Sequence, residues 1–484
     1  MPTRIGWCKR WAGPWAALAA ARLARCLAPE GDAPRHDPFR RVLANAGWNL
    51  LATVLPLAAA VLAMPWLAQR LGTERFGLLA LAWVLIGYFG LFEFGLGRAL
   101  TKFVAERTGR PSAVDLPVVC STTLGLAVAA GLVGGLVVAA LAAWGDGWMA
   151  RVPPALRTEV QQGLFIIALG IPPTVGTAAF RGMLEGLQRF KLLTAIRVPA
   201  GLLLFAAPAL TAWYTPRLDW ALASIVLTRW LLLAHAAPCW RALGLLMQRF
   251  SASWVRPLFA MGGWLTVSNV VSPVIVYADR FVIGGLLSAT ALAHYAAPFE
   301  LVSRLLVLPV ALAGALFPAL AAAQSARGGA TVTLADLQAA RRLRRQALQL
   351  TLVTVLPLAV LGAAGATPLL GLWMGPEFAD NGSMATRILL LGFVFNALAH
   401  IPFAALHGHG LARQTALLHL LELPLYLLCL VALVRQHGIE GAAAAWAGRA
   451  AFDLVALAWL LHRAERRLQH GAHGPVLAQG NDLT

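Results

Sequence analysis

Long apolar stretches alternate with short polar connections along almost the whole chain. A helix needs about 20 mostly apolar residues to cross the hydrocarbon core of a membrane, because each residue advances it by about 1.5 Å. Residues 125–143 are apolar on every side, which favours transmembrane helices over the alternating strands of a membrane β-barrel. The pattern predicts about twelve spans, at 47–69, 76–97, 114–144, 161–180, 192–214, 219–240, 257–284, 291–321, 347–372, 386–405, 414–434 and 440–462.

The composition agrees with lipid as the solvent for most of this chain. Hydrophobic residues make up 59% of the sequence and charged residues only 12%, whereas a soluble domain carries about a quarter of charged residues. We therefore predict an all-α, polytopic integral membrane protein without a soluble catalytic domain.

The net charge of +18 reflects membrane topology rather than nucleic-acid binding. Most of the 39 lysines and arginines fall in segments that share one side of the membrane, in short juxtamembrane runs such as 341–345. We expect a protein of a bacterial-type inner membrane, and under the positive-inside rule this bias predicts that both termini lie in the cytoplasm. The loops Asp146 to Glu159 and Glu377 to Arg387 are then expected outside.

A faint internal repeat predicts two parallel bundles of six helices each. Gly47-Trp48 recurs as Gly263-Trp264, and Gly186-Leu187 recurs as Gly410-Leu411. The expected organisation is an N-terminal cytoplasmic extension that is disordered or amphipathic, an N-lobe, a C-lobe and a disordered cytoplasmic tail, at 1–36, 37–250, 251–470 and 471–484.

Motifs for nucleotide, metal or cofactor chemistry are not found in the sequence. The only lysines are Lys9, Lys102 and Lys191, and none of them closes a phosphate-binding G-x-x-x-x-G-K-[ST] loop. The five cysteines are scattered, so they predict neither a disulfide framework nor a metal site. His407-Gly408-His409 is interpreted as a short turn rather than a metal pair. We expect no cofactor.

Charges at membrane depth are the candidate functional residues, because each costs about 2.5–3.5 kcal/mol at a helix centre. Asp279 and Arg280 lie in the seventh expected helix, and Glu300 and Arg304 lie one turn apart in the eighth. The alternative role is a buried bridge that only locks helices. We expect these four residues to line a polar cavity between the lobes.

Further basic residues extend this candidate set. Arg229 lies in the sixth expected helix, and Arg449 and Asp453 form an i,i+4 pair in the twelfth, where a structural bridge is an equal alternative. Arg98 and Lys102 lie one turn apart near the cytoplasmic boundary. Guanidinium groups there suit a phosphate arriving from the inner leaflet, although ordinary positive-inside anchoring is the alternative.

Several short motifs resemble the polysaccharide transporter family of Wzx-like oligosaccharide flippases, within the multidrug/oligosaccharidyl-lipid/polysaccharide flippase superfamily. The resemblance covers about residues 37–465. It rests on Leu71-Gly72-Thr73-Glu74-Arg75-Phe76-Gly77, Phe94-Gly95-Leu96-Gly97, Glu185-Gly186-Leu187-Gln188-Arg189-Phe190, Asp279-Arg280-Phe281-Val282-Ile283-Gly284, Tyr295, Glu300 to Arg304, Pro309 and Phe317-Pro318.

This resemblance implies two six-helix bundles arranged as a V, and export of an undecaprenyl-pyrophosphate-linked oligosaccharide to the periplasmic leaflet by alternating access. The implied partners are this substrate, membrane lipids, a polysaccharide polymerase with its export machinery, and a coupling proton or sodium ion. The rivals are a multidrug antiporter, a lipid II flippase and, third, a membrane polymerase or glycosyltransferase. An antiporter for cationic drugs should carry an acidic interior, whereas this interior is rich in arginine.

Overall fold

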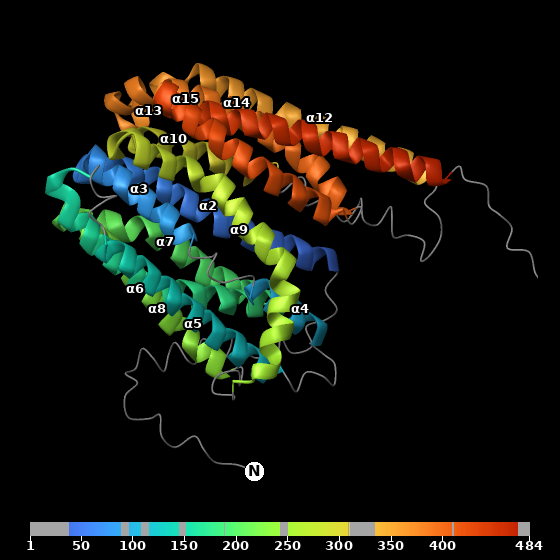
Figure 1. The fold of residues 1–484 in the computed structure, drawn as a ribbon, viewed down its shortest axis with the longest axis horizontal. Coiled ribbons are helices and arrows are strands. Elements are labelled where there is room, and N and C mark those ends of the chain that lie inside the picture. The colour runs from blue at the N-terminus through green and yellow to red at the C-terminus, as the bar shows by residue number, and fades with distance from the viewer. Residues whose placement is uncertain are drawn as a thin grey trace, which may run out of the picture. The chain divides into compact units, whose positions relative to one another are not determined.

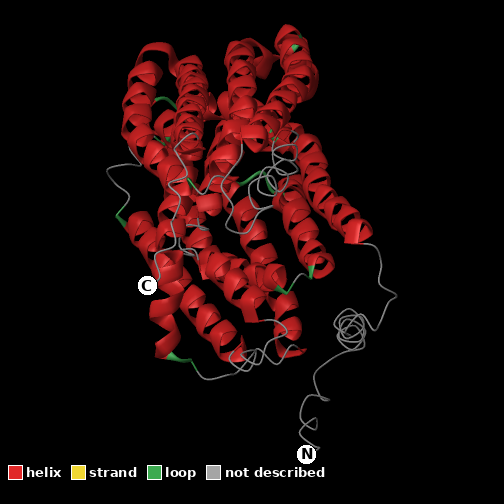
Figure 2. Ribbon diagram, turned by 90° about the vertical axis from the view of Figure 1, so that its right-hand side faces the viewer, coloured by secondary structure: helices red, strands yellow, loops and turns green. Residues whose placement is uncertain are grey.

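The computed structural model describes residues 38–88, 96–107, 116–144, 152–187, 189–242, 250–307, 309, 334–408 and 411–472. All regular elements within these ranges are helices (Figure 2). Eight of the described helices are long and apolar enough to cross a membrane. The helical fold is thus confirmed, while the count of twelve spans stays a prediction. The expected extension at 1–36 lies outside the described residues.

The chain divides into two compact units, Met1–Pro273 and Val274–Thr484, and the division falls inside one helix, later than the lobe boundary expected at residue 250. The lobe assignment itself stays a prediction. Figure 1 labels the helices of both units. Those of the first are α2 (Pro38–Leu71), α3 (Thr73–Tyr88), α4 (Leu96–Arg107), α5 (Leu116–Ala143), α6 (Arg157–Gly186), α7 (Phe190–Tyr214) and α8 (Leu218–Ala242), with short 3₁₀ turns at Pro154–Leu156 and Ala252–Trp254.

Helix α6 is the centre of the first unit, because it packs against α4, α5 and α8. Close approach depends on glycine. A Cβ atom on Gly131 would lie 2.7 Å from Pro172 Cα, and one on Gly135 would lie 2.8 Å from the Ala168 carbonyl oxygen. Lipid tails are as apolar as leucine, so helices in a membrane associate through such small-residue contacts rather than through a hydrophobic driving force.

The outer faces of the helices are apolar. Leu62, Leu136, Leu169 and Val353 are between 64% and 76% exposed. A soluble protein of this composition would hide these side chains, whereas hydrocarbon solvates them. Exposed aromatic residues gather where α5 and α7 end and α8 begins, namely Trp144, Trp213, Tyr214 and Trp220. Trp and Tyr are enriched at the membrane interface, so these residues mark one edge of the bilayer.

Helix α9 (Val255–Leu286) contains the division between the units. The second unit continues with α10 (Ala289–Leu305), α12 (Leu334–Ala364), α13 (Ala366–Met374), α14 (Pro376–Gly408) and α15 (Ala412–Ala472). Helix α14 packs against α10, α12, α13 and α15, and α12, α14 and α15 run together in Figure 1.

One stretch expected as a loop is helical, which corrects the sequence analysis. Residues 377–387, expected as an outer loop, form the first turns of α14, where Glu377 favours a helix start and lies 3.1 Å from His294 of α10. The basic juxtamembrane run 341–345 lies within α12, where Glu465 of α15 accepts a hydrogen bond from Arg341 Nε at 2.9 Å and also pairs with Arg344. The tail expected from residue 471 is helical through Ala472.

Helix α15 is a hairpin of two helices. A straight helix of its 61 residues would be about 90 Å long, three times the thickness of the hydrocarbon core. The direction reverses at Gly438, whose φ of 57° and ψ of −135° strain any residue with a side chain. Gly441 then passes so close to the first half that a Cβ would lie 2.0 Å from the Leu433 carbonyl oxygen. The expected spans 414–434 and 440–462 occupy the two halves.

Replacing Gly441 with alanine should therefore destabilise the protein. Overpacking of this kind costs about 1–3 kcal/mol, so the Tm in detergent should fall. Gly448→Ala is the matched control in the same helix, since nothing lies within 4 Å of its added Cβ, and its Tm should stay level or rise. Equal Tm values for the two variants would contradict the close contact in the hairpin.

Candidate functional site

Asp279 and Arg280 of α9 form a closed, buried pair inside the second unit. Arg280 Nη1 lies 3.2 Å from Asp279 Oδ1, with the two side chains 3% and 0% exposed. The Tyr295 hydroxyl of α10 donates a hydrogen bond of 2.6 Å to Asp279 Oδ2, and the Arg280 guanidinium lies 4.1 Å from the centre of the Phe299 ring. Both charges are thus neutralised and covered by protein.

Glu300 and Arg304 of α10 form the expected i,i+4 pair, but in a more open setting. Arg304 Nε donates to Glu300 Oε1 at 2.9 Å, and the two side chains are 32% exposed for Arg304 and 25% for Glu300. The Arg304 side chain is thus more accessible than that of Arg280.

In the first unit, Arg98 and Lys102 lie one turn apart on α4, as expected. Lys102 is exposed, whereas the Arg98 side chain lies outside what the structure describes. Helix α4 is fixed against α6, because the Thr101 hydroxyl donates to the Gly182 carbonyl oxygen at 2.8 Å. A Cβ atom on Gly182 would lie 2.3 Å from the Gly97 carbonyl oxygen. This contact between α4 and α6 fixes the position along α6 at which Arg98 and Lys102 of α4 lie.

Arg229 is a partly buried arginine in the middle of α8. Arg181 of α6 lies close enough to act on it electrostatically, and no acidic group pairs with Arg229 within the described ranges. Arg229 thus has a positive neighbour and no acidic partner among the described residues, and an anion would neutralise its charge.

The seven predicted residues are thus divided between the units. Asp279, Arg280, Glu300 and Arg304 come together on α9 and α10, and Arg98, Lys102 and Arg229 lie in the first unit on α4 and α8. Their role in substrate binding stays a prediction.

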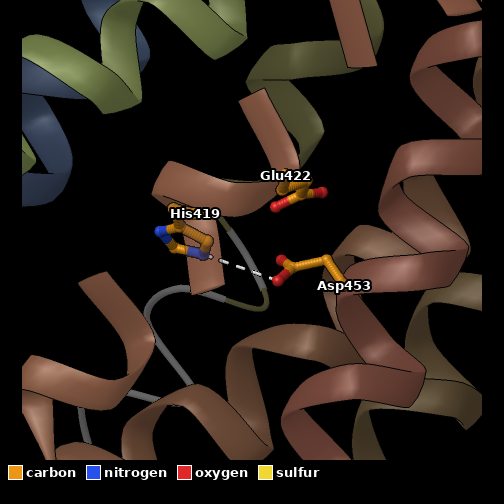
Figure 3. A group of neighbouring side chains, drawn as sticks. All are labelled: His419, Glu422 and Asp453. Atoms are coloured by element: carbon orange, nitrogen blue, oxygen red, sulfur yellow. Dashed lines mark ion pairs between the residues drawn. The ribbon is translucent and has the colours of Figure 1, made fainter. Parts of the chain in front are cut away.

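The expected i,i+4 pairing of Arg449 with Asp453 is wrong. Arg449 Nη1 instead lies 3.7 Å from Glu422 Oε1, and Asp453 Oδ1 lies 3.4 Å from His419 Nε2. The reason is the hairpin, which places His419 and Glu422 of the first half of α15 opposite Asp453 and Arg449 of the second. Figure 3 shows three of these side chains meeting between the two halves.

Sequence reasoning missed His419 and Glu422 as members of this group. The signal was available, because Glu422 is an acidic residue inside an expected span and His419 precedes it by three residues, on the same face of a helix. His407 was interpreted as part of a loop. In the structure it lies in α14, with Nε2 3.0 Å from the Thr415 hydroxyl.

Helices of membrane-spanning length, with ionic groups buried among them, define a multi-pass membrane protein. The chain belongs to the polysaccharide biosynthesis protein family, whose sequence model matches residues 42–324. This membership confirms the resemblance drawn from the short motifs.

Two relatives support the assignment along most of the chain. A Shigella flexneri protein described as a candidate O-antigen transporter is 30% identical over 425 residues, which cover 87% of this chain and 98% of that protein. The uncharacterised membrane protein EpsK of Bacillus subtilis is 26% identical over 370 residues, covering 74% of this chain and 70% of EpsK.

Solved structures show that the fold is shared with membrane transporters. An inward-facing multidrug resistance MATE transporter matches with a TM-score of 0.71 and 13% identity, over 87% of this chain and 99% of that one. The lipid II flippase MurJ, in an inward closed conformation, matches with a TM-score of 0.64 and 11% identity, over 91% and 94%. At these identities the likeness concerns the fold alone.

The different burial of the two arginines of α9 and α10 predicts different costs for their loss. Arg280→Gln leaves the Asp279 carboxylate buried without its charge partner, which should cost about 3–5 kcal/mol and lower both the Tm and the amount of protein in the membrane. Arg304→Gln removes a partner from the partly exposed Glu300 carboxylate, so the cost should be about 0–1 kcal/mol. Equal losses of Tm would contradict the closed setting of Arg280.

Proposed function

We propose that this chain is a flippase that moves an undecaprenyl-pyrophosphate-linked oligosaccharide from the cytoplasmic to the periplasmic leaflet of the inner membrane. It supplies surface polysaccharide synthesis by alternating access and catalyses no covalent reaction. The family membership and the Shigella relative support this class of substrate. The superfamily fold supports a transport role.

The observation that carries the proposal is the unpaired positive charge on Arg229. An arginine at membrane depth is costly, so its presence without an acidic partner in the described part of the chain calls for another anion. Pyrophosphate is such an anion, and a guanidinium fork binds two of its oxygens at once. We assign Arg229, with Arg98 and Lys102 nearer the expected cytoplasmic boundary, to the pyrophosphate, and the Glu300–Arg304 pair to a later contact with the substrate. The Asp279–Arg280 pair of α9 has a structural role, because it holds α10 in place through Tyr295 and Phe299.

Topology fixes the direction of transport in this proposal. The positive-inside bias places both termini in the cytoplasm. The basic residues of α4 then lie on the side where lipid-linked sugars are assembled. The expected partners are the membrane lipids and a polysaccharide polymerase with export machinery that uses the delivered substrate.

The same charges argue against the rival functions. An antiporter of cationic drugs needs an acidic binding region, whereas Arg229 and Arg181 form a basic one. The lipid II flippase shares the fold and an anionic substrate, so it is the nearer rival.

The energy source is an ion gradient in this proposal. No nucleotide-binding motif is present in the sequence. A membrane potential supplies about 2.3 kcal/mol per charge per 100 mV, and a proton or sodium gradient is a comparable source.

Purified protein in liposomes should flip undecaprenyl pyrophosphate that carries a fluorescent sugar, without added nucleotide. Arg229→Gln should slow flipping at least tenfold, which corresponds to about 1.4 kcal/mol. Its Tm should not fall, because an uncompensated charge has been removed. Arg435→Gln, which changes an exposed arginine, is the control and should flip at the wild-type rate.

Three results would contradict the proposal. Flipping that requires ATP would exclude an ion-driven mechanism. Equal rates for Arg229→Gln and Arg435→Gln would remove Arg229 from the substrate path. Transport of a cationic dye in place of the lipid-linked sugar would favour the antiporter.

A further inference from the structure

The four ionisable side chains between the halves of α15 form a compact group that the proposed substrate path does not use. We name His419, Glu422, Arg449 and Asp453 the hairpin cluster. One ligand atom from each of His419, Glu422 and Asp453 lies within 4.8 Å of the others, and Figure 3 shows these three side chains converging. Glu422 is 3% exposed and Asp453 is 8% exposed.

The hairpin cluster is under-satisfied in hydrogen bonds. Neither carboxylate oxygen of Glu422 has a hydrogen-bond partner, and the same holds for Asp453 Oδ1 and Arg449 Nε. Buried polar groups are normally satisfied, so each exception needs an explanation. Here the unsatisfied atoms face one another across the hairpin, which points to a small species that binds among them.

The charge count identifies this species. Two carboxylates and one guanidinium leave one net negative charge when His419 is neutral, and a net charge inside hydrocarbon is costly. A single added proton makes the cluster neutral. A divalent metal ion would leave one positive charge in excess, and Arg449, 3.7 Å from Glu422, would repel it. Sodium, a hard cation, prefers oxygen ligands and gains little from an imidazole.

We propose that the hairpin cluster is the proton-exchange site that couples the flippase to the pH gradient. This inference rests on the proposed function. A proton from water binds His419 Nε2, the imidazolium pairs with Asp453, and the cluster is neutral; when the same proton returns to water, the single negative charge reappears. His419 is the entry point, because its side chain is 21% exposed while those of Glu422 and Arg449 are 2% and 8% exposed.

Groups on neighbouring helices surround the cluster without changing this count. On α14, His400 lies within electrostatic range of Asp453, and His407 lies within electrostatic range of His419. The Phe403 ring, also on α14, stacks on the His419 ring, with ring centres 6.1 Å apart. Tyr426 of α15 lies under Arg449, 5.9 Å from its guanidinium, and faces Tyr295 of α10. Neutral histidines and tyrosines leave the negative charge of the cluster in place.

The proton also has a mechanical effect. Both ion pairs join the first half of α15 to the second. With the proton bound, two neutralised pairs hold the halves together. Without it, Glu422 and Asp453 share one positive partner and repel each other, so the equilibrium of the hairpin shifts. A conformational equilibrium that a proton biases in this way is what ion-driven transport requires.

Thermal unfolding of the purified full chain at pH 6 and pH 9 tests the site without substrate. Because the buried cluster is neutral only with the proton bound, wild-type stability should be highest at pH 6 and fall as the pH rises. Glu422→Gln removes the excess negative charge, so its loss of Tm between pH 6 and pH 9 should shrink by at least half. His419→Gln cannot take up the proton, so its Tm should already be low at pH 6.

Glu440→Gln and His437→Gln are the controls, because both positions are exposed on the same hairpin. Each should keep the wild-type fall in Tm. If Glu422→Gln behaves like Glu440→Gln, the hairpin cluster does not exchange a proton and the inference is wrong.

Liposomes test the coupling. An imposed pH gradient should accelerate wild-type flipping of the fluorescent lipid-linked sugar at least fivefold over equal pH. Glu422→Gln and His419→Gln should lose this acceleration, whereas Glu440→Gln should keep it, and a sodium gradient should accelerate none of them. Acceleration by sodium, or retained acceleration in Glu422→Gln, would overturn the inference. No flipping by the wild type under any gradient would instead refute the proposed function, and the unfolding data would still decide whether the cluster binds a proton.

Discussion

A charge inside a membrane must be neutralised by the protein or by something the protein binds, and the described structure contains both solutions. Asp279 and Arg280 neutralise each other and are sealed by Tyr295 and Phe299. Arg229 has a basic neighbour and no acidic partner in the described ranges. The hairpin cluster lies between these extremes, with two acids for one arginine. Fixed pairs build the scaffold, whereas unbalanced groups are the places where an anion or a proton can bind.

Glycine makes this arrangement of charges possible. The charged side chains have fixed positions along their helices only because these helices approach each other closely. Helices α4 and α6 do so at Gly97 and Gly182, and the two halves of α15 do so at Gly441. Without a hydrophobic driving force between helices in lipid, such close packing supplies the association energy. The positions of Lys102 on α4 and of Glu422 opposite Arg449 thus follow from backbone contacts rather than from the charges themselves.

The sequence predicts the helices well because apolar length is a local property, and each expected span overlaps a described helix. It predicts the Glu300–Arg304 pair for the same reason, since i,i+4 spacing lies within one helix. It fails for Arg449 and Asp453, whose partners Glu422 and His419 come from the other half of a hairpin. It also fails to separate the closed Arg280 from the open Arg304, because burial depends on neighbouring helices. The helical stretch 377–387 was missed because polar residues at a helix start read as a loop.

The central claim is that this chain carries a lipid-linked oligosaccharide across the inner membrane. The most direct test is the leaflet in which that lipid resides in cells with and without the gene, measured by labelling spheroplasts with a sugar-reactive reagent that does not cross membranes. Cells that lack the chain should accumulate lipid-linked sugar that the reagent cannot reach, and restoring the chain should return it to the outer leaflet. Normal labelling in cells without the chain, with surface polysaccharide unchanged, would contradict the account.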